Sequence, residues 1–152
     1  MHSSPLSGAC EFVGRWRKRL TPARKSPEHL RLGARGEKLA ANFLRRNGYK
    51  ILYRNFRGRR GGEVDIVSRD GDTLVFVEVK TRTRQDFGRP AEAVDSAKQK
   101  LIARGALAWL QILDNPDILA RFDIVEVLID EGGKPRCELV RDAFQLPAPY
   151  VY

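Results

Sequence analysis

Two carboxylates and a lysine near the middle of the chain have the types and spacing needed for metal-assisted hydrolysis. Asp65 and Glu78 are separated by twelve residues, and Lys80 follows two residues after Glu78. Between the carboxylates, Asp70-Gly71-Asp72 joins two apolar runs of strand type, which predicts a tight β-hairpin. Because side chains alternate along a strand, the length of the turn decides whether the carboxylates share a face.

The turn has three alternatives, and two of them bring the acidic residues together. A two-residue loop at Gly71-Asp72 places Asp65 directly opposite Glu78 and Glu63 opposite Lys80. A two-residue loop one position earlier keeps the carboxylates on one face as diagonal neighbours. A three-residue loop turns every side chain of one strand to the other face and breaks the arrangement.

Facing carboxylates on paired strands repel each other unless a positive charge lies between them. Mg²⁺ is held in proteins by one or two carboxylates, with water and substrate phosphate as further ligands. The hairpin therefore predicts a divalent-metal site, for Mg²⁺ or Mn²⁺, at Asp65 and Glu78. Lys80, on the face of Glu78, could orient or deprotonate the attacking water of phosphodiester hydrolysis, or stabilise charge on the phosphate. In the function that this site predicts, the Val79 carbonyl is a further metal ligand and Lys80 positions the water.

A structural alternative is that Glu78 and Lys80 are ordinary solvent-facing residues, since Glu-x-Lys occurs by chance in many proteins. The preceding run Leu74-Val75-Phe76-Val77 is apolar at every position, which indicates a central strand buried on both faces. Charges at the end of such a strand are costly unless they are paired or metal-bound, and this favours the functional interpretation.

The same residues carry a resemblance to known nucleases. Asp65 with Glu78-Val79-Lys80 resembles the PD-(D/E)xK nuclease signature, and a wider set resembles the bacterial YraN family, an endonuclease-like family related to archaeal Holliday-junction resolvases. That set covers about residues 33–129 and consists of Gly36-Glu37, Asn55, Arg57, Gly62-Glu63-Val64-Asp65, Phe76-Val77-Glu78-Val79-Lys80, Arg82, Phe87-Gly88, Pro90, Glu92-Ala93-Val94 and Lys98. The resemblance implies a Mg²⁺-dependent DNA endonuclease with an α/β, restriction-endonuclease-like core, in which one mixed sheet is flanked by helices.

Two further residues gain a role from the resemblance. Glu37 lies at the border of the apolar face of a helix, either as a solvated charge or as a third acidic group at the metal, and the resemblance favours the second. Lys98 matches a family position in the first turn of a later helix, where it either contacts phosphate or is solvated.

Arginines around the hairpin are candidates for binding a nucleic-acid backbone. Arg57, Arg59 and Arg60 belong to a Gly-rich loop that leads directly into Glu63, and such a loop can hold phosphate. Arg82 continues the face of Glu78 if the strand persists. These arginines and Lys98 are the predicted phosphate contacts.

The net charge of +9 indicates a polyanionic partner, with nucleic acid first and an anionic membrane surface second. Residues 1–35 hold eight basic and two acidic side chains, so most of the excess belongs to this segment. No apolar run approaches the roughly 18 residues of a membrane span. Cys10 and Cys137 lie far apart and are interpreted as thiols of a reducing cytosol, which predicts a cytoplasmic protein. Both histidines, His2 and His29, lie near the amino terminus, which argues against a histidine-based site.

The expected organisation is one domain with two irregular ends. Residues 1–27 are predicted to be a flexible basic extension, 28–145 the endonuclease-like domain and 146–152 an irregular tail. Periodicity predicts the order α-β-β-β-α-β-β. The expected elements are helices over about 28–47 and 96–113, and strands over 49–56, 64–68, 73–79, 121–129 and 136–143.

The leading functional hypothesis is a metal-dependent endonuclease acting on DNA, including branched or damaged DNA. The alternative is a non-catalytic nucleic-acid-binding or adaptor protein that keeps the nuclease fold. A third hypothesis is association with a membrane surface through residues 1–35. The sequence leaves open the structure of the substrate, any sequence preference and whether the chain forms a homodimer as junction-resolving enzymes do.

Overall fold

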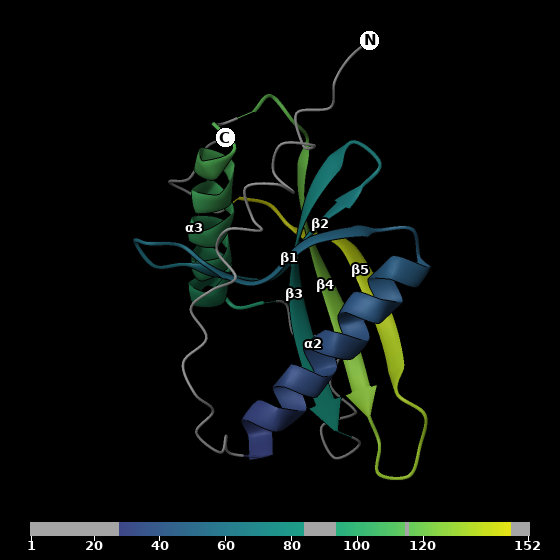
Figure 1. Cartoon of the computed structure of the whole chain (residues 1–152). Coiled ribbons are helices and arrows are strands. Elements are labelled where there is room, and N and C mark those ends of the chain that lie inside the picture. The colour runs from purple at the N-terminus through teal and green to yellow at the C-terminus, as the bar shows by residue number, and fades with distance from the viewer. Residues whose placement is uncertain (1–27, 84–93, 115, 147–152) are drawn as a thin grey trace, which may run out of the picture.

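The computed structural model describes residues 28–83, 94–114 and 116–146. The expected extension at 1–27 and residues 147–152 of the expected tail lie outside the described residues. None of the described helices is long and apolar enough to span a membrane. The described elements, labelled in Figure 1, are α2 (Glu28–Arg46), β1 (Lys50–Arg57), β2 (Glu63–Asp70), β3 (Thr73–Thr83), α3 (Ser96–Ile112), β4 (Ala120–Ile129) and β5 (Arg136–Phe144).

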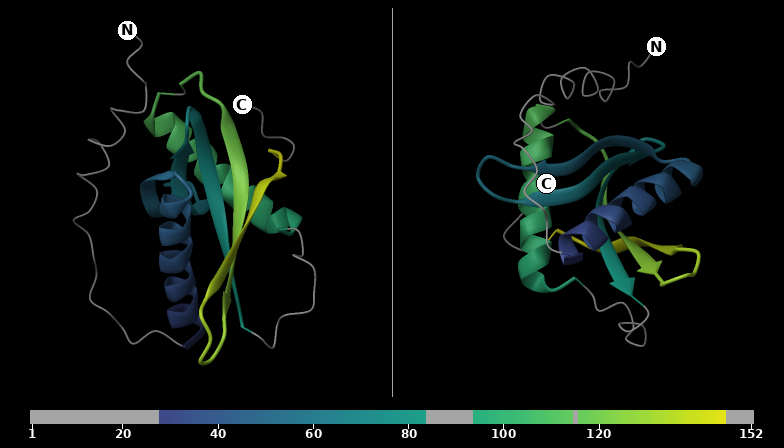
Figure 2. Two further views of the ribbon diagram at one scale, coloured as in Figure 1. Left: turned by 90° about the vertical axis from the view of Figure 1, so that its right-hand side faces the viewer. Right: turned by 60° about the horizontal axis from the view of Figure 1, so that its bottom comes forward.

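The strands form one mixed sheet in the order β1-β2-β3-β4-β5. The β3–β4 pair is parallel and is connected through α3, while the other neighbours are antiparallel. Helix α2 packs against one face of the sheet and α3 against the other (Figure 2). This α/β arrangement confirms the predicted element order and is consistent with the restriction-endonuclease-like fold.

Strand β3 lies at the centre of the sheet because its apolar run can be buried on both faces. Leu74, Val75, Phe76 and Val77 are all 0% exposed, as the unbroken apolar pattern predicts. Alternate residues face two separate cores, Leu74 and Phe76 toward α3 and Val75 and Val77 toward α2. Glu78 continues the α3 face by the same alternation.

The β2–β3 turn has the length that brings the carboxylates together. Asp70 pairs with Thr73, so Gly71 and Asp72 form a two-residue loop. Gly71 has a φ of 58°, a conformation that glycine adopts without steric cost. The pairing continues to Ile66 opposite Val77, in the register of the predicted two-residue turn.

The β1–β2 connection crosses α3 at very short range (Figure 1). A Cβ atom on Gly62 would collide with the backbone nitrogen of Gly105, and one on Gly58 would lie 2.9 Å from the Ala108 methyl group. Gly62 also has a positive φ of 89°. Glycines of the Arg-Gly loop are therefore required for packing, and they place the start of β2 against the middle of α3.

Candidate metal centre

The candidate site lies where β2 and β3 separate. Their pairing ends at Ile66 and Val77, and beyond it the Asp65 Oδ2 atom accepts a hydrogen bond of 2.8 Å from the Val79 backbone N–H. The Asp65 carboxylate thus accepts the hydrogen bond that a backbone carbonyl of a paired strand would otherwise accept. The register directs Asp65 and Glu78 to the same face of the hairpin, so two acidic side chains meet at this opening.

Glu78 is buried and incompletely hydrogen-bonded. It is 8% exposed, and its Oε2 atom has no hydrogen-bond partner. Burial raises the pKa of Glu78 to about 8. Repulsion from Asp65 and a hydrogen bond between the two carboxyl groups act in the same direction, while Lys98 opposes these effects. Because a buried carboxylate is unfavourable without a cation, this residue is suited to bind either a proton or a metal ion.

Lys98 reaches this site from α3. Its Nζ atom lies 2.7 Å from Glu63 Oε1 and 3.3 Å from Glu78 Oε1. Although burial lowers the pKa of Lys98, the hydrogen bond to Glu63 and the nearby carboxylates produce a net increase. The hydrogen bond from Lys98 in turn lowers the pKa of Glu63. Lys98 was a candidate phosphate contact in the sequence, and the structure places it between two carboxylates.

The start of α3 fixes the position of Lys98. Asp95 is the N-cap residue, and its Oδ1 atom accepts a 2.8 Å hydrogen bond from the Lys98 backbone N–H. Further along the helix, Gly105 touches the backbone of Glu63. The expectation that Glu63 would lie opposite Lys80 is wrong, because strand pairing ends before that position and Glu63 contacts Lys98 instead.

Glu37 approaches from α2 on the other side of the sheet. A Cβ atom on the preceding residue, Gly36, would collide with Thr81, so the helix lies very close to β3 here. Burial raises the pKa of Glu37, and repulsion from Asp65 and Glu63 adds to the increase, while a hydrogen bond with Asn55 opposes it. The structure therefore brings Glu37 to the edge of the carboxylate pair.

Asn55 is a site residue to which the sequence analysis gave no role. It has a positive φ of 54° in the middle of β1, a conformation in which asparagine is enriched among non-glycine residues. This geometry accompanies its hydrogen bond with Glu37. An asparagine inside a predicted strand was the available signal.

The remaining candidate residues surround the opening at different depths. The Arg57 guanidinium is 82% exposed and lies 4.0 Å from Glu63 Oε2, while Arg59 and Arg60 are exposed on the β1–β2 connection. Arg82 Nε lies 3.8 Å from Glu126 Oε1 in a more buried pair. Lys80 is half-buried and shares the face of Glu78 by strand alternation. Arg57 and Lys98 thus converge on Glu63, whereas Arg82 is engaged with β4.

The donor atoms at the opening fit a hard divalent cation with water in its coordination shell. In the described ranges no three acidic, histidine or cysteine side chains group closely enough to hold a metal by themselves. The Val79 N–H points toward β2, and its carbonyl points the same way because both groups of a strand residue face one neighbour. Asp65, Glu78 and the Val79 carbonyl would hold Mg²⁺ or Mn²⁺, with water completing the octahedron.

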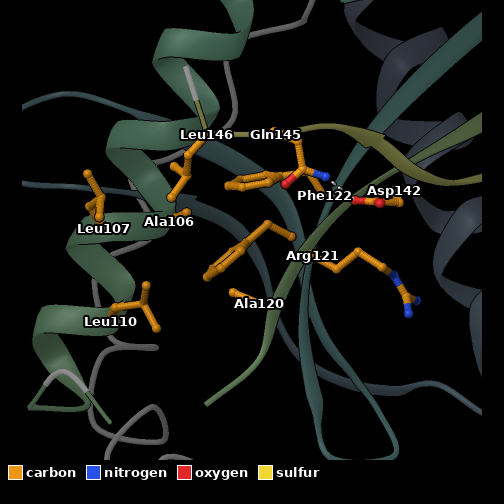
Figure 3. A pocket seen from close by; sticks show the side chains of 10 residues that line it. Ala106, Leu107, Leu110, Ala120, Arg121, Phe122, Asp142, Gln145 and Leu146 are labelled. Carbon is orange, nitrogen blue, oxygen red and sulfur yellow. Dashed lines mark hydrogen bonds between the residues drawn. The ribbon is translucent and has the colours of Figure 1, made fainter. Parts of the chain in front are cut away.

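A cavity of about 190 Å³ lies elsewhere, between α3 and the adjacent parts of β4 and β5 (Figure 3). Its lining is largely apolar and includes Phe76, Leu110 and Phe122. The Arg121 guanidinium at its rim points away from α3 and is bonded to Asp123. The cavity does not include the carboxylates of the hairpin opening, so it is not the candidate site.

Comparison with known proteins gives the family. The family model described as "Uncharacterised protein family UPF0102" matches residues 36–127. This chain belongs to the UPF0102 family. It is 51% identical over 115 residues to a UPF0102 protein of Geobacter metallireducens, covering 76% of this chain and 93% of the relative. A UPF0102 protein of Rhodococcus opacus is 48% identical over 116 residues, covering 76% and 98%. The resemblance to the YraN family is confirmed by the UPF0102 match.

Proposed function

We propose that this UPF0102 protein is a metal-dependent endonuclease that hydrolyses phosphodiester bonds in DNA. The observation that carries the proposal is the meeting of Asp65 with the buried Glu78, whose Oε2 atom has no hydrogen-bond partner, at the end of the β2–β3 pairing. A structural carboxylate pair would be expected to have all its oxygens hydrogen-bonded. Two carboxylates that keep an oxygen without a hydrogen bond are suited to bind a metal ion, which in turn binds the substrate phosphate.

Each residue of the site has its own role in hydrolysis, which follows from its position. Asp65, Glu78 and the Val79 carbonyl hold Mg²⁺ or Mn²⁺, which supplies Lewis-acid stabilisation of the phosphoryl oxygens when bound. Lys80, on the face of Glu78, positions the attacking water. Glu37 has a raised pKa because it is half-buried beside other carboxylates, so it is suited to accept a proton from that water.

Basic side chains around the opening account for binding of the substrate backbone. Arg57, Arg59 and Arg60 are exposed on or next to the β1–β2 connection, which leads into the site. Arg82 and Lys98 add positive charge on β3 and α3. DNA, including branched DNA, is the proposed substrate class, and the cytoplasm is the proposed location. A homodimer, as in enzymes that cut symmetric junctions, is a proposal for the same substrate class.

The direct test is a cleavage panel of linear, nicked and four-way-junction DNA with Mg²⁺, Mn²⁺ or EDTA. Wild-type protein should cut at least one substrate with metal and none with EDTA, and Asp65→Asn or Lys80→Ala should remove the activity. Asp72→Asn is the matched control, because Asp72 is an exposed carboxylate at the other end of the same hairpin. Activity of Asp65→Asn equal to that of wild type would overturn the assignment.

One observation favours a second candidate, a nucleic-acid-binding protein without turnover. The Lys98 ammonium already lies beside Glu63 and Glu78, so the acidic groups are partly neutralised within the chain. An adaptor of this kind would bind DNA equally well in EDTA and would show no Mn²⁺ binding that depends on Asp65 and Glu78. Calorimetry with Mn²⁺ separates the two candidates without a DNA substrate.

A further inference from the structure

We propose that the Lys98 ammonium is an internal competitor of the metal ion, which contacts Glu78 in the metal-free protein and releases it, while keeping its contact with Glu63, when a cation binds. This inference rests on the proposed metal site and adds the means by which the site is kept neutral before it is loaded. Glu63, Glu78 and Lys98 all belong to the described residues.

The Lys98 ammonium lies close to the oxygens of Glu78 that would bind the metal ion. Lys98 Nζ lies 3.3 Å from Glu78 Oε1, and Mg²⁺ would bind a carboxylate oxygen at about 2.0–2.1 Å. A cation on Glu78 Oε1 would lie within about 5 Å of the ammonium, and a cation on the unpartnered Oε2 would lie somewhat farther away, so the two positive charges repel each other at either oxygen. The Glu78 side chain is only 10% exposed, so solvent screens this repulsion poorly. Binding of the ion therefore favours release of Glu78 by the ammonium.

Glu63 can hold the Lys98 ammonium after it has released Glu78. The Lys98 contact with Glu63, at 2.7 Å, is shorter than that with Glu78, so the ammonium is held even without the second partner. The Glu63 side chain is 38% exposed and lies at the outer side of the pair. Because the Asp95 cap fixes the Lys98 backbone, the change needs only rotation of a flexible lysine side chain.

Calorimetric titration with Mn²⁺ alone, on the full chain without nucleic acid and at one pH, tests the inference. Lys98→Met should bind Mn²⁺ at least about tenfold more tightly than wild type, because the competing charge is gone. Lys98→Arg, which keeps the charge, should remain close to wild type. Lys100→Met is the matched control, since Lys100 is an exposed lysine on the same helix turn, and it should change the affinity by less than about twofold.

Thermal unfolding gives a second readout that needs no calorimetry. Without metal, Lys98→Met should melt below wild type because Glu63 and Glu78 then lose the ammonium that contacts both of them. Saturating Mn²⁺ should raise its Tm by more than it raises that of wild type. Lys98→Gln removes the same charge while keeping an N–H donor, and it replaces Lys98→Met if that variant does not fold.

The outcomes separate this inference from the proposed function. Wild-type binding that is lost in Asp65→Asn, together with unchanged or weaker binding in Lys98→Met, would overturn the competition and leave the metal site standing. If neither wild type nor the Lys98 variants bind Mn²⁺, both proposals fail. Tighter binding in Lys98→Met that disappears when Asp65→Asn is added would support both and assign the gain to this site.

Discussion

The two ends of the β2–β3 hairpin carry charged clusters of opposite character. The cluster that reaches the turn through Asp70 is centred on Arg121 and Asp123 of β4, and Asp123 is 0% exposed. Its Oδ1 atom accepts from Arg121 Nε at 2.8 Å and from the Asp142 N–H at 3.0 Å, and its Oδ2 atom accepts from the Arg121 guanidinium at 2.9 Å. Tyr49 and Asp70 complete the network with further bonds to Arg121. At the open end, Glu78 is also buried but keeps an oxygen without a donor.

The difference indicates which buried charges stabilise the fold and which are suited to bind a ligand. A carboxylate that is bonded on both oxygens to an arginine, as Asp123 is to Arg121, is already compensated for its lost hydration. Glu78 shares one ammonium with Glu63 and faces a second carboxylate, so its compensation is incomplete. We therefore assign the turn end to stability and the open end to chemistry, and the following experiments test that division.

The largest effect is expected for Arg121→Met at the turn end. Removing the guanidinium leaves the wholly buried Asp123 without its main partner, and breaking such a pair costs about 3–5 kcal/mol. Denaturant unfolding measures the loss. Arg141→Met is the control, because Arg141 is more exposed and lies 4.0 Å from Asp70, so it should cost at most about 1 kcal/mol. Equal losses in the two variants would show that the network does not stabilise the fold.

Asp65→Asn should have the reverse profile at the open end. The amide oxygen can still accept the Val79 N–H, and loss of one negative charge relieves repulsion with Glu78, so the free energy of unfolding should stay within about 1 kcal/mol of wild type. Affinity for Mn²⁺ should fall about 100-fold because one of two carboxylate ligands is lost. Asp123→Asn should behave in the opposite way to Asp65→Asn: its stability should fall strongly, while the affinity of the folded protein for Mn²⁺ should not change.

The raised pKa of Glu78 predicts how stability depends on pH in the metal-free protein. A folded-state pKa of about 8, above the ordinary value of 4.5, means that the native state binds an extra proton between these values. Stability from this group is therefore fully present below about pH 4.5 and is lost as the pH rises through 8. Glu78→Gln should remove this slope and stabilise the protein at pH 8.5 relative to wild type. Parallel Tm profiles from pH 5 to 9 in EDTA would contradict the prediction.

The smallest effect is expected at the helix start that holds Lys98. Asp95→Ala removes the N-cap acceptor and should lower stability by about 1 kcal/mol. If the cap also positions the lysine, the affinity for Mn²⁺ should shift by a few-fold as well. Asp95→Asn keeps a capping oxygen and should restore both values. Loss of stability in Asp95→Asn equal to that in Asp95→Ala would mean that the carboxylate charge, not the cap, matters here.

Much of the fold and half of the site follow from local sequence. Gly71 permits the two-residue turn, and the alternation of side chains then puts Asp65 and Glu78 on one face without any knowledge of the remaining chain. The apolar run of Leu74–Val77 likewise requires cover on both sides, which gave the central strand and the two helical layers. These features depend on near neighbours and a fixed period, so the sequence alone determined them.

The tertiary structure alone decided which charges meet at the opening. Lys98 reaches Glu63 and Glu78 because Gly62 and Gly105 let the start of β2 lie directly on α3, a contact between segments far apart in sequence. The same docking gave Glu63 a partner other than the expected Lys80, and the packing of α2 brought Glu37 to the same carboxylates. Strand periodicity determines the face of a side chain, but helix packing determines its distance from a distant charge.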